Sequence, residues 1–250
     1  MRTDFKTFLI SLYIWTFILA TLTPLFALYV IIWLVVYPFD RKHAVTQFYT
    51  MLWTRLYLTC NPGWHLKVEG RKNIGHGRNY IFVANHQSVI DIALLNQLNV
   101  NFRWVSKIEL SRVPFVGWVI RMNGHILVKR GDKLSVVMMA ESCIDVLKKG
   151  ISVFMFPEGT RSSDGNIQPF KEGAFILAKS VDVPIIPVVI DGAGEALPRH
   201  GFWFQPRQTF TVRILEEIPV ETVQCLELNE LINLTSDRMI RELKKIRMKE

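Results

Sequence analysis

A histidine and an aspartate five positions apart, in Asn85-His86-Gln87-Ser88-Val89-Ile90-Asp91, are the residues best suited to proton transfer. A carboxylate on one ring nitrogen of His86 would fix its tautomer and leave the other nitrogen free to take a proton from an attacking hydroxyl. Five helical positions turn through roughly 140°, so the pairing needs a bend, with Ser88 as helix N-cap and Asp91 in the first turn. In the alternative, Ser88 and Asp91 only cap a helix, and His86 is a polar loop residue.

The segment Phe156-Pro157-Glu158-Gly159-Thr160-Arg161-Ser162 offers groups for a phosphate and a hydroxyl. The planar donors of Arg161 suit a phosphate, Glu158 could hold a substrate hydroxyl, and Gly159 permits unusual backbone angles. The alternative is a charged turn with a surface ion pair between Glu158 and Arg161. Its position relative to the histidine segment favours the first interpretation.

Both segments follow runs that predict strands of one sheet. Strands alternate with helical stretches, most clearly at residues 133–149, which is typical of an α/β fold with a mostly parallel sheet flanked by helices. Because ligands bind outside the carboxyl ends of such strands, the polar residues that follow them are expected to converge on one pocket. The predicted buried strands are residues 80–84, 102–106, 126–128, 151–156 and 183–190, and the runs that alternate like edge strands are 64–69 and 209–215.

Three further cations, Lys107, Lys129 and Arg130, follow the second and third of these strands. Each alone is more often a solvated surface charge. Their common position after strands predicts that they add positive charge at the same edge of the sheet, where a phosphate would need it.

Residues 7–39 contain no Asp, Glu, Lys or Arg and predict a membrane anchor. A straight helix of this length would measure about 50 Å, whereas the hydrocarbon core of a bilayer is about 30 Å thick. Pro24 lies near the middle and is expected to break or kink the helix, leaving two arms of about 14 residues, each about 21 Å long. We therefore expect a helical hairpin dipped into one leaflet, with a tilted single span as the alternative. Basic residues flank both ends of the run, so the positive-inside rule does not distinguish the two ends.

The composition favours a lipid partner over a nucleic acid. Thirty Lys and Arg against 22 Asp and Glu give a net charge of +8, which indicates a polyanionic partner. A mean hydropathy of +0.21 and aromatic residues concentrated in the apolar run are unusual for a nucleic-acid binder but expected at an anionic membrane surface. Cys60, Cys143 and Cys225 are scattered, which indicates neither a disulfide framework nor a zinc site.

Taken together, residues 80–190 resemble the glycerolipid acyltransferases typified by 1-acylglycerol-3-phosphate acyltransferase. The family often carries an aromatic residue where Leu127 stands and an acid where Lys129 stands, so Lys129 receives no family role. The ordered segments that carry the resemblance are residues 85–91, 107–110 leading to Pro114 and Gly117, 124–130, 156–162 and 183–188.

The resemblance implies a reaction and a set of roles. The expected reaction moves a fatty acyl chain from a thioester of coenzyme A or acyl carrier protein to the sn-2 hydroxyl of 1-acylglycerol 3-phosphate (lysophosphatidic acid), giving phosphatidic acid. The acyl thioester is a co-substrate, and the resemblance implies neither a metal nor a cofactor. The implied roles are His86 as general base, Asp91 as its orienting partner, Lys107, Arg130 and Arg161 as phosphate ligands, and Glu158 and Gly159 as glycerol ligands.

We therefore expect an anchor of two helices in residues 1–45 and one acyltransferase domain in residues 46–250. The protein would be membrane-bound, with the catalytic domain on the cytoplasmic face of the cell membrane. Its partners would be a membrane lipid, the acyl donor and an anionic membrane surface. Residues 202–204, Phe-Trp-Phe, would be a second membrane contact or an aromatic loop packed on the domain. The functional alternatives are acyl transfer to glycerol 3-phosphate or another lysolipid, and a non-catalytic basic membrane-associated scaffold.

Overall fold

A computed structural model of the chain describes residues 4–198 and 201–248. Within them lies one seven-stranded sheet with the strand order β1-β7-β6-β2-β5-β3-β4. All neighbouring strands are parallel except β6 and β7, so β1 and β7 run against the other five. The strands are β1 (Trp64–Glu69), β2 (Ile81–Ala84), β3 (Phe102–Lys107), β4 (Ile126–Val128), β5 (Ser152–Met155), β6 (Ile185–Asp191) and β7 (Gln208–Ile214).

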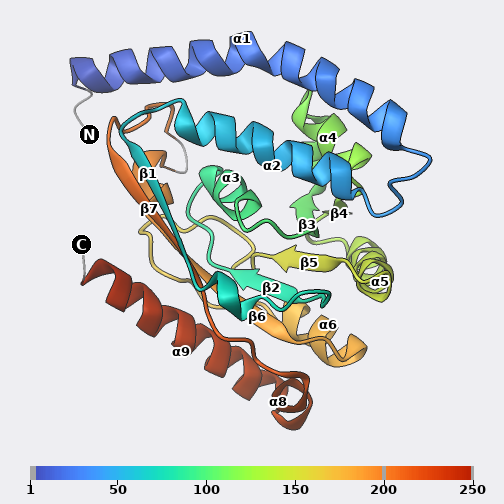
Figure 1. Cartoon of the computed structure of the whole chain (residues 1–250). Coiled ribbons are helices and arrows are strands. Elements are labelled where there is room, and N and C mark those ends of the chain that lie inside the picture. The colour runs from blue at the N-terminus through green and yellow to red at the C-terminus, as the bar shows by residue number, and fades with distance from the viewer. Residues whose placement is uncertain (1–3, 199–200, 249–250) are drawn as a thin grey trace.

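Helices cover both faces of this sheet (Figure 1). They are α1 (Phe5–Val36), α2 (Ala44–Thr59), α3 (Ile90–Asn96), α4 (Val116–Met122), α5 (Lys133–Lys148), α6 (Gly173–Val181), α7 (Ala193–Ala196), α8 (Val220–Cys225) and α9 (Leu228–Arg247), with 3-10 turns η1 (Arg71–Asn73) and η2 (Ile108–Arg112). Side chains of α1, α2 and α3 pack on one face, and side chains of α5, α6 and α9 pack on the other.

Side chains of the central strands alternate between two apolar layers. Phe82 and Ala84 of β2 lie in the layer that contains α3, whereas Ile81 and Val83 lie in the layer that contains α5 and α6. Phe82 stacks on Phe154 of β5 with ring centroids 5.2 Å apart. Because side chains alternate between the two faces along a strand, His86, two positions beyond Ala84, is directed toward the α3 face.

The expected α/β fold with a mostly parallel sheet is confirmed, and each predicted strand lies within two residues of an observed one. The prediction that residues 209–215 form an edge strand is wrong, because β7 lies between β1 and β6. Apolar and polar residues alternate along β7 because one face of this strand is only partly covered. Arg213 on that face stays half-buried and pairs with Glu242 of α9, while Phe210 and Val212 on the other face are buried. The strands at the two edges are β1, as predicted, and β4. The prediction of a buried strand at residues 126–128 is wrong, because β4 has a neighbour on one side only and just Ile126 is buried.

The prediction that Pro24 divides the apolar run into two short arms is also wrong, because α1 is one helix of 32 residues with Pro24 inside it. Proline removes a single helical hydrogen bond, and packing on both sides of it keeps the helix continuous. Ile14 is buried in the core beneath α1, and the Tyr29 hydroxyl donates to Asn123 Oδ1 at 2.9 Å. The Tyr49 hydroxyl of α2 donates to the backbone oxygen of Leu25, next to the proline, at 2.8 Å.

A helical hairpin exists, but its turn lies at residues 37–43, between α1 and α2. Asp40 stabilises the start of α2, because its carboxylate accepts from the backbone N–H groups of Ala44 at 2.7 Å and Val45 at 2.9 Å. The buried Arg103 of β3 donates to the backbone oxygen of Lys42, which attaches this turn to the sheet. The second helix therefore extends beyond residue 45, the expected end of the anchor, and lies between α1 and α3.

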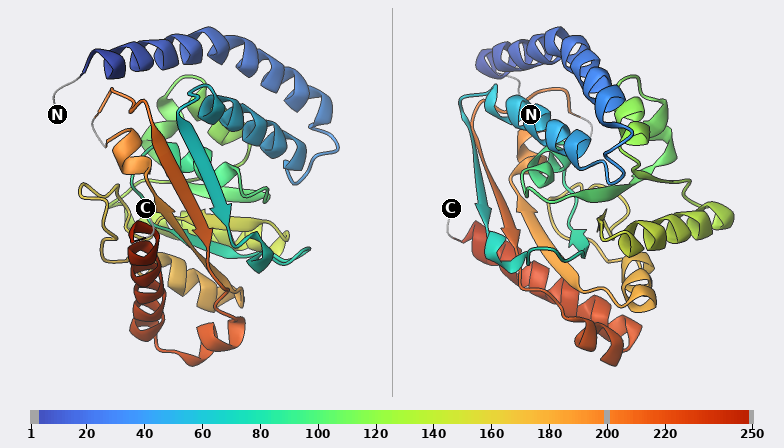
Figure 2. Two further views of the ribbon diagram at one scale, coloured as in Figure 1. Left: turned by 60° about the vertical axis from the view of Figure 1, so that its left-hand side comes forward. Right: turned by 45° about the vertical axis from the view of Figure 1, so that its right-hand side comes forward.

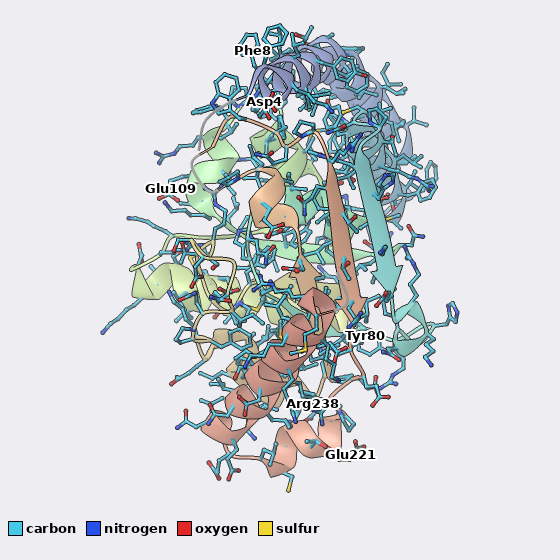
Figure 3. All side chains as sticks on the ribbon, turned by 90° about the vertical axis from the view of Figure 1, so that its left-hand side faces the viewer. Asp4, Phe8, Tyr80, Glu109, Glu221 and Arg238 are labelled. Carbon is cyan, nitrogen blue, oxygen red and sulfur yellow. The ribbon has the colours of Figure 1, made fainter. Side chains whose placement is uncertain are left out.

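Helix α1 leaves most of its surface uncovered. Its most apolar 18-residue window has a mean hydropathy of 2.3, and only 6% of that window is buried. At 1.5 Å per residue the helix measures about 48 Å, so it is long and apolar enough to cross a membrane. Figure 3 shows Phe8 at the outer edge of α1, at the opposite end of the molecule from Glu221 and Arg238 of α8 and α9.

Residues 202–204 pack against α1. The Trp15 indole donates to the backbone oxygen of Phe202 at 2.9 Å, and its ring lies 5.3 Å from that of Phe204. Trp203 lies 5.8 Å from Phe8 and stays partly exposed, as does Phe202. The loop therefore combines aromatic packing with exposed rings beside the apolar helix.

Candidate active site

The histidine and aspartate predicted to act together are in contact. His86 Nδ1 lies 2.6 Å from Asp91 Oδ2. The Asn85 side chain forms two hydrogen bonds of 2.8 Å with the backbone of Ile190 in the neighbouring strand β6, which fixes the chain just before the histidine. Because Nδ1 faces the carboxylate, Nε2 is the ring nitrogen available for proton transfer.

The bend between the two residues is built around the same carboxylate oxygen. Asp91 Oδ2 also accepts from the backbone N–H groups of Gln87 at 2.7 Å and Ser88 at 2.9 Å. Helix α3 begins at Ile90 with Val89 as its N-cap, so Ser88 is not the cap that the sequence predicted. The Ser88 hydroxyl donates to the backbone oxygen of Leu197 instead. The fully buried Asp91 thus both stabilises the turn and holds the imidazole.

Aromatic stacking fixes the plane of the imidazole. The His86 ring lies 4.0 Å from the Phe156 ring at an angle of 17°, and Phe156 in turn stacks on Trp104. The His86 side chain is 17% exposed, whereas Asp91 is fully buried. The base is therefore held on two sides and reachable from one.

That open side is a pocket of about 360 Å³ at the carboxyl ends of β3, β4 and β5. It brings together four residues that the sequence singled out, from four segments of the chain, and a fifth that it did not. Lys107 lines the pocket, and its Nζ lies 3.4 Å from Glu109 Oε1. Lys129 instead pairs with Asp132, and neither of these two residues lines the pocket. The four predicted residues that line the pocket are His86, Lys107, Arg130 and Gly159, and the fifth is Lys171.

Lys171 was missed because it lies well beyond a strand end, in a stretch without periodicity. The only signal in the sequence was indirect, through Gly159. Gly159 has a φ of +68°, and a Cβ atom there would lie 2.9 Å from Lys171 Nζ and 3.0 Å from its Cε. A glycine at this position thus lets the lysine side chain cross the loop toward the pocket.

Glu158 points away from this pocket into the protein and is only 5% exposed. Its Oε1 accepts from the backbone N–H of His86 at 2.8 Å, and its Oε2 accepts from the backbone N–H of Gln168 at 3.0 Å. The Ser162 N–H donates to the backbone oxygen of His86 at 2.8 Å, so residues 158–168 wrap around the histidine. Neither Glu158 nor Arg161 is among the described residues that line the pocket.

Burial raises the pKa of Glu158 to about 7 from 4.5, although the two backbone amides oppose the shift. A group with a raised folded-state pKa stabilises the fold fully below its unfolded pKa, and that contribution is lost as pH rises through the folded value. We therefore expect Glu158 to stabilise the protein by up to about 3 kcal/mol at low pH, since one pKa unit is about 1.4 kcal/mol.

The measurement is thermal unfolding in detergent of wild type and Glu158→Gln at pH 5 and pH 7.5. The advantage of wild type in Tm is expected to shrink by several degrees at the higher pH. An advantage that grows with pH would mean that the backbone amides, rather than burial, control this carboxyl group.

Among the residues described, no group of three or more His, Cys, Asp or Glu side chains could hold a metal ion. A family model described as Acyltransferase matches residues 65–191. This range includes His86, every residue that lines its pocket, and strands β2 to β6. The chain belongs to the acyltransferase family. The resemblance seen in the motifs is thereby confirmed.

Known relatives are similar over the same region. The chain is 37% identical over 162 residues to the chloroplastic 1-acyl-sn-glycerol-3-phosphate acyltransferase LPAT1 of Arabidopsis thaliana, covering 64% of this chain and 44% of that protein. It is 33% identical over 196 residues to the 1-acyl-sn-glycerol-3-phosphate acyltransferase of Saccharomyces cerevisiae, covering 74% and 61%. The chain spans about half the length of the curated relatives it matches.

A solved structure agrees over nearly the whole chain. The crystal structure of the 1-acyl-sn-glycerophosphate acyltransferase from Thermotoga maritima is similar with a TM-score of 0.80 and 27% identity. The alignment covers 99% of this chain and 98% of that one, so the match includes the long apolar helix α1.

Proposed function

We propose that this acyltransferase moves a fatty acyl chain from an acyl thioester to the sn-2 hydroxyl of 1-acylglycerol 3-phosphate, giving phosphatidic acid. The observation that carries the proposal is an imidazole backed by a buried carboxylate at the wall of a pocket that also holds three cationic side chains. The names of the relatives and of the Thermotoga maritima structure point to the same acceptor.

In the proposed reaction His86 Nε2 takes the proton of the sn-2 hydroxyl while the hydroxyl oxygen forms a bond to the thioester carbonyl carbon. The tetrahedral intermediate then collapses, the carbon–sulfur bond breaks, and the sulfur leaves with the proton from the imidazolium. A thioester is already activated, so no covalent acyl-enzyme is needed. Asp91 keeps the proton on Nδ1 before the reaction and stabilises the imidazolium during it.

The phosphate of the acceptor would lie among Lys107, Arg130 and Lys171. Arg161 is a fourth proposed phosphate ligand, on the strength of the family motif. Gly159 would admit the glycerol beside the lysine. Both oxygens of Glu158 already accept from backbone amides, so we assign Glu158 the role of holding the loop around His86 in place of binding the glycerol.

Helix α1 would keep the active site at the membrane surface, with the catalytic domain on the cytoplasmic face. Acceptor and product carry acyl chains that leave a bilayer at a cost of about 0.8 kcal/mol per CH₂ group. An enzyme anchored in the same leaflet avoids that cost. The donor in this proposal is a thioester of coenzyme A or acyl carrier protein, brought from the aqueous side as co-substrate.

The decisive experiment is an acyl-transfer assay with the purified full-length protein in lipid vesicles. The acceptors compared are 1-acylglycerol 3-phosphate, glycerol 3-phosphate and an uncharged-headgroup lysolipid, each with acyl-coenzyme A and acyl carrier protein thioesters. Phosphatidic acid formed preferentially from 1-acylglycerol 3-phosphate is the expected product. Preferential acylation of another acceptor would identify that acceptor as the substrate in place of 1-acylglycerol 3-phosphate. No acyl transfer to any of the acceptors would favour the scaffold alternative.

Replacing Lys171 with methionine is expected to raise KM for 1-acylglycerol 3-phosphate about tenfold and to leave kcat nearly unchanged. A charge-assisted pair at a partly exposed site contributes roughly 1.4 kcal/mol, which corresponds to a factor of ten. Lys148→Met, an exposed lysine at the end of α5, is the matched control. Equal KM values for the two variants would exclude Lys171 from the phosphate site.

A further inference from the structure

The first turns of α5 carry an apolar surface that none of the described residues covers. Leu134 is 70% exposed, Val137 is 53% exposed and Met138 is 58% exposed. Their spacing of three and four positions places them on one face of the helix. Large apolar side chains gathered on one face of a protruding helix end are a mark of an interaction surface. We call these three residues the α5 patch.

Cations surround the α5 patch. Lys129 and Lys133 flank it and are exposed, and Arg130 lies between them at the wall of the pocket. Asp132 is the only acidic residue among residues 129–138, and it pairs with Lys129. The combination of apolar side chains with a surplus of positive charge suits the interface of an anionic bilayer.

A second exposed apolar surface connects the pocket mouth to the membrane helix α1. It consists of residues on η2 and α4, and at one end Trp118 lies 5.3 Å from Phe26 of α1. At the other end Leu110 lines the pocket, which is also lined by Val136 of α5. The η2–α4 surface is formed by Leu110, Val113, Val116 and Trp118, each between 39% and 48% exposed.

These surfaces share one side of the molecule. In Figure 3 α1 lies along the top, Glu109 of η2 lies at the left-hand edge, and α5 extends to the same edge below it. The right-hand view of Figure 2 shows α5 projecting away from the sheet on the side where α4 lies. Exposed apolar side chains of the η2–α4 surface and of α5 therefore lie on the same side of the molecule as α1, and residues of both η2 and α5 line the pocket.

We propose that the N-terminal end of α5 is a second membrane contact, which inserts the α5 patch into the interfacial region of an anionic phospholipid bilayer. The pocket then opens between two membrane contacts, α1 with η2–α4 on one side and α5 on the other. If the proposed function holds, the acceptor enters sideways from the leaflet with its acyl chain still in lipid. The contact of the η2–α4 surface with the apolar helix α1, on the same side as the α5 patch, favours a bilayer over a second copy of the chain or an acidic protein.

The test is quenching of a fluorophore by nitroxide lipids in vesicles of phosphatidylcholine and phosphatidylglycerol. The label is placed on Met138→Cys in the full-length Cys225→Ser protein, because Cys60 and Cys143 are buried. Phe8→Cys on α1 is the positive control and Glu221→Cys on α8, at the far end in Figure 3, is the negative control. A label at position 138 is expected to lose about half its fluorescence to a nitroxide near the headgroup, and the label at position 221 is expected to lose almost none.

Equal quenching at positions 138 and 221 would overturn the proposal. Self-quenching between labels at position 138 in detergent would identify a second copy as the occupant, and shielding of the label by acyl carrier protein without lipid would identify that protein. Either outcome also refutes the bilayer contact. None of these measurements depends on enzymatic activity.

A second measurement separates this proposal from the function itself. Val137→Glu is expected to lower kcat/KM at least fivefold for 1-acylglycerol 3-phosphate presented in anionic vesicles, and to leave the rate with a short-chain, water-soluble acceptor unchanged. Met248→Glu, at an exposed apolar position at the end of α9, is the matched control. Equal loss with both acceptors would count against the α5 contact, and no activity with either acceptor in wild type would count against the proposed function.

Discussion

Replacing His86 with alanine is expected to lower kcat by roughly 10²- to 10⁴-fold, the usual contribution of a positioned general base. His86 lines the pocket with Nδ1 held by Asp91 and Nε2 available as the base, and its removal leaves the cations of the pocket in place. The fold is expected to survive, because Asp91 keeps its hydrogen bonds to the backbone of Gln87 and Ser88. The measurements are steady-state acyl transfer in vesicles, thermal unfolding and vesicle binding.

His65→Ala is the matched control, since His65 is an exposed histidine on β1. The enzymatic proposal predicts lost activity with unchanged unfolding and vesicle binding for His86→Ala, and no change for the control. The scaffold alternative predicts the reverse, a change in folding or lipid association without a catalytic defect. An active His86→Ala variant would mean that another group takes the proton.

Convergence of the polar segments on one edge of the sheet could be predicted from the sequence, because it follows from the topology of parallel strands. Lys107 is the last residue of β3, Arg130 and Gly159 follow β4 and β5, and the parallel pairing of these strands brings their ends together. Buried strands such as β2, predicted at residues 80–84, also show a short apolar run that depends little on context. These features are local in sequence, and the sheet makes them neighbours in space.

The rest could not be predicted, because it depends on contacts between distant residues. Pro24 lies within a continuous helix because distant partners hold its two halves, and no local pattern shows them. Before the proline, the backbone N–H of Phe204 donates to the Ser11 hydroxyl, and after it the Tyr29 hydroxyl donates to Asn123. Glu158 is an acidic residue in a loop, yet its side chain turns inward to backbone amides of His86 and Gln168. A side chain's direction in an irregular loop is set by such tertiary hydrogen bonds and not by spacing.

Replacing Asp91 with asparagine is expected to lower kcat by roughly 10²- to 10³-fold and to destabilise the protein by about 1–3 kcal/mol. The amide keeps one oxygen for the three donors that now share Asp91 Oδ2, and its NH₂ group brings two further donors into a buried site. A neutral amide can neither hold the proton on Nδ1 nor balance the imidazolium formed during the reaction. Thermal unfolding measures the destabilisation, and assays well below the variant's Tm measure kcat.

The double variant His86→Ala/Asp91→Asn separates orientation of the base from a purely structural role. If Asp91 acts through the imidazole, its substitution has nothing left to disturb once His86 is absent, so the double variant is expected to be no slower than His86→Ala. Effects on kcat that multiply would instead mean that Asp91 supports the reaction independently of His86. The stability effects of the two substitutions are free to add, because the bonds from Asp91 to the backbone of Gln87 and Ser88 exist without the histidine. Non-additivity confined to kcat is therefore the signature of a carboxylate that works by holding the base.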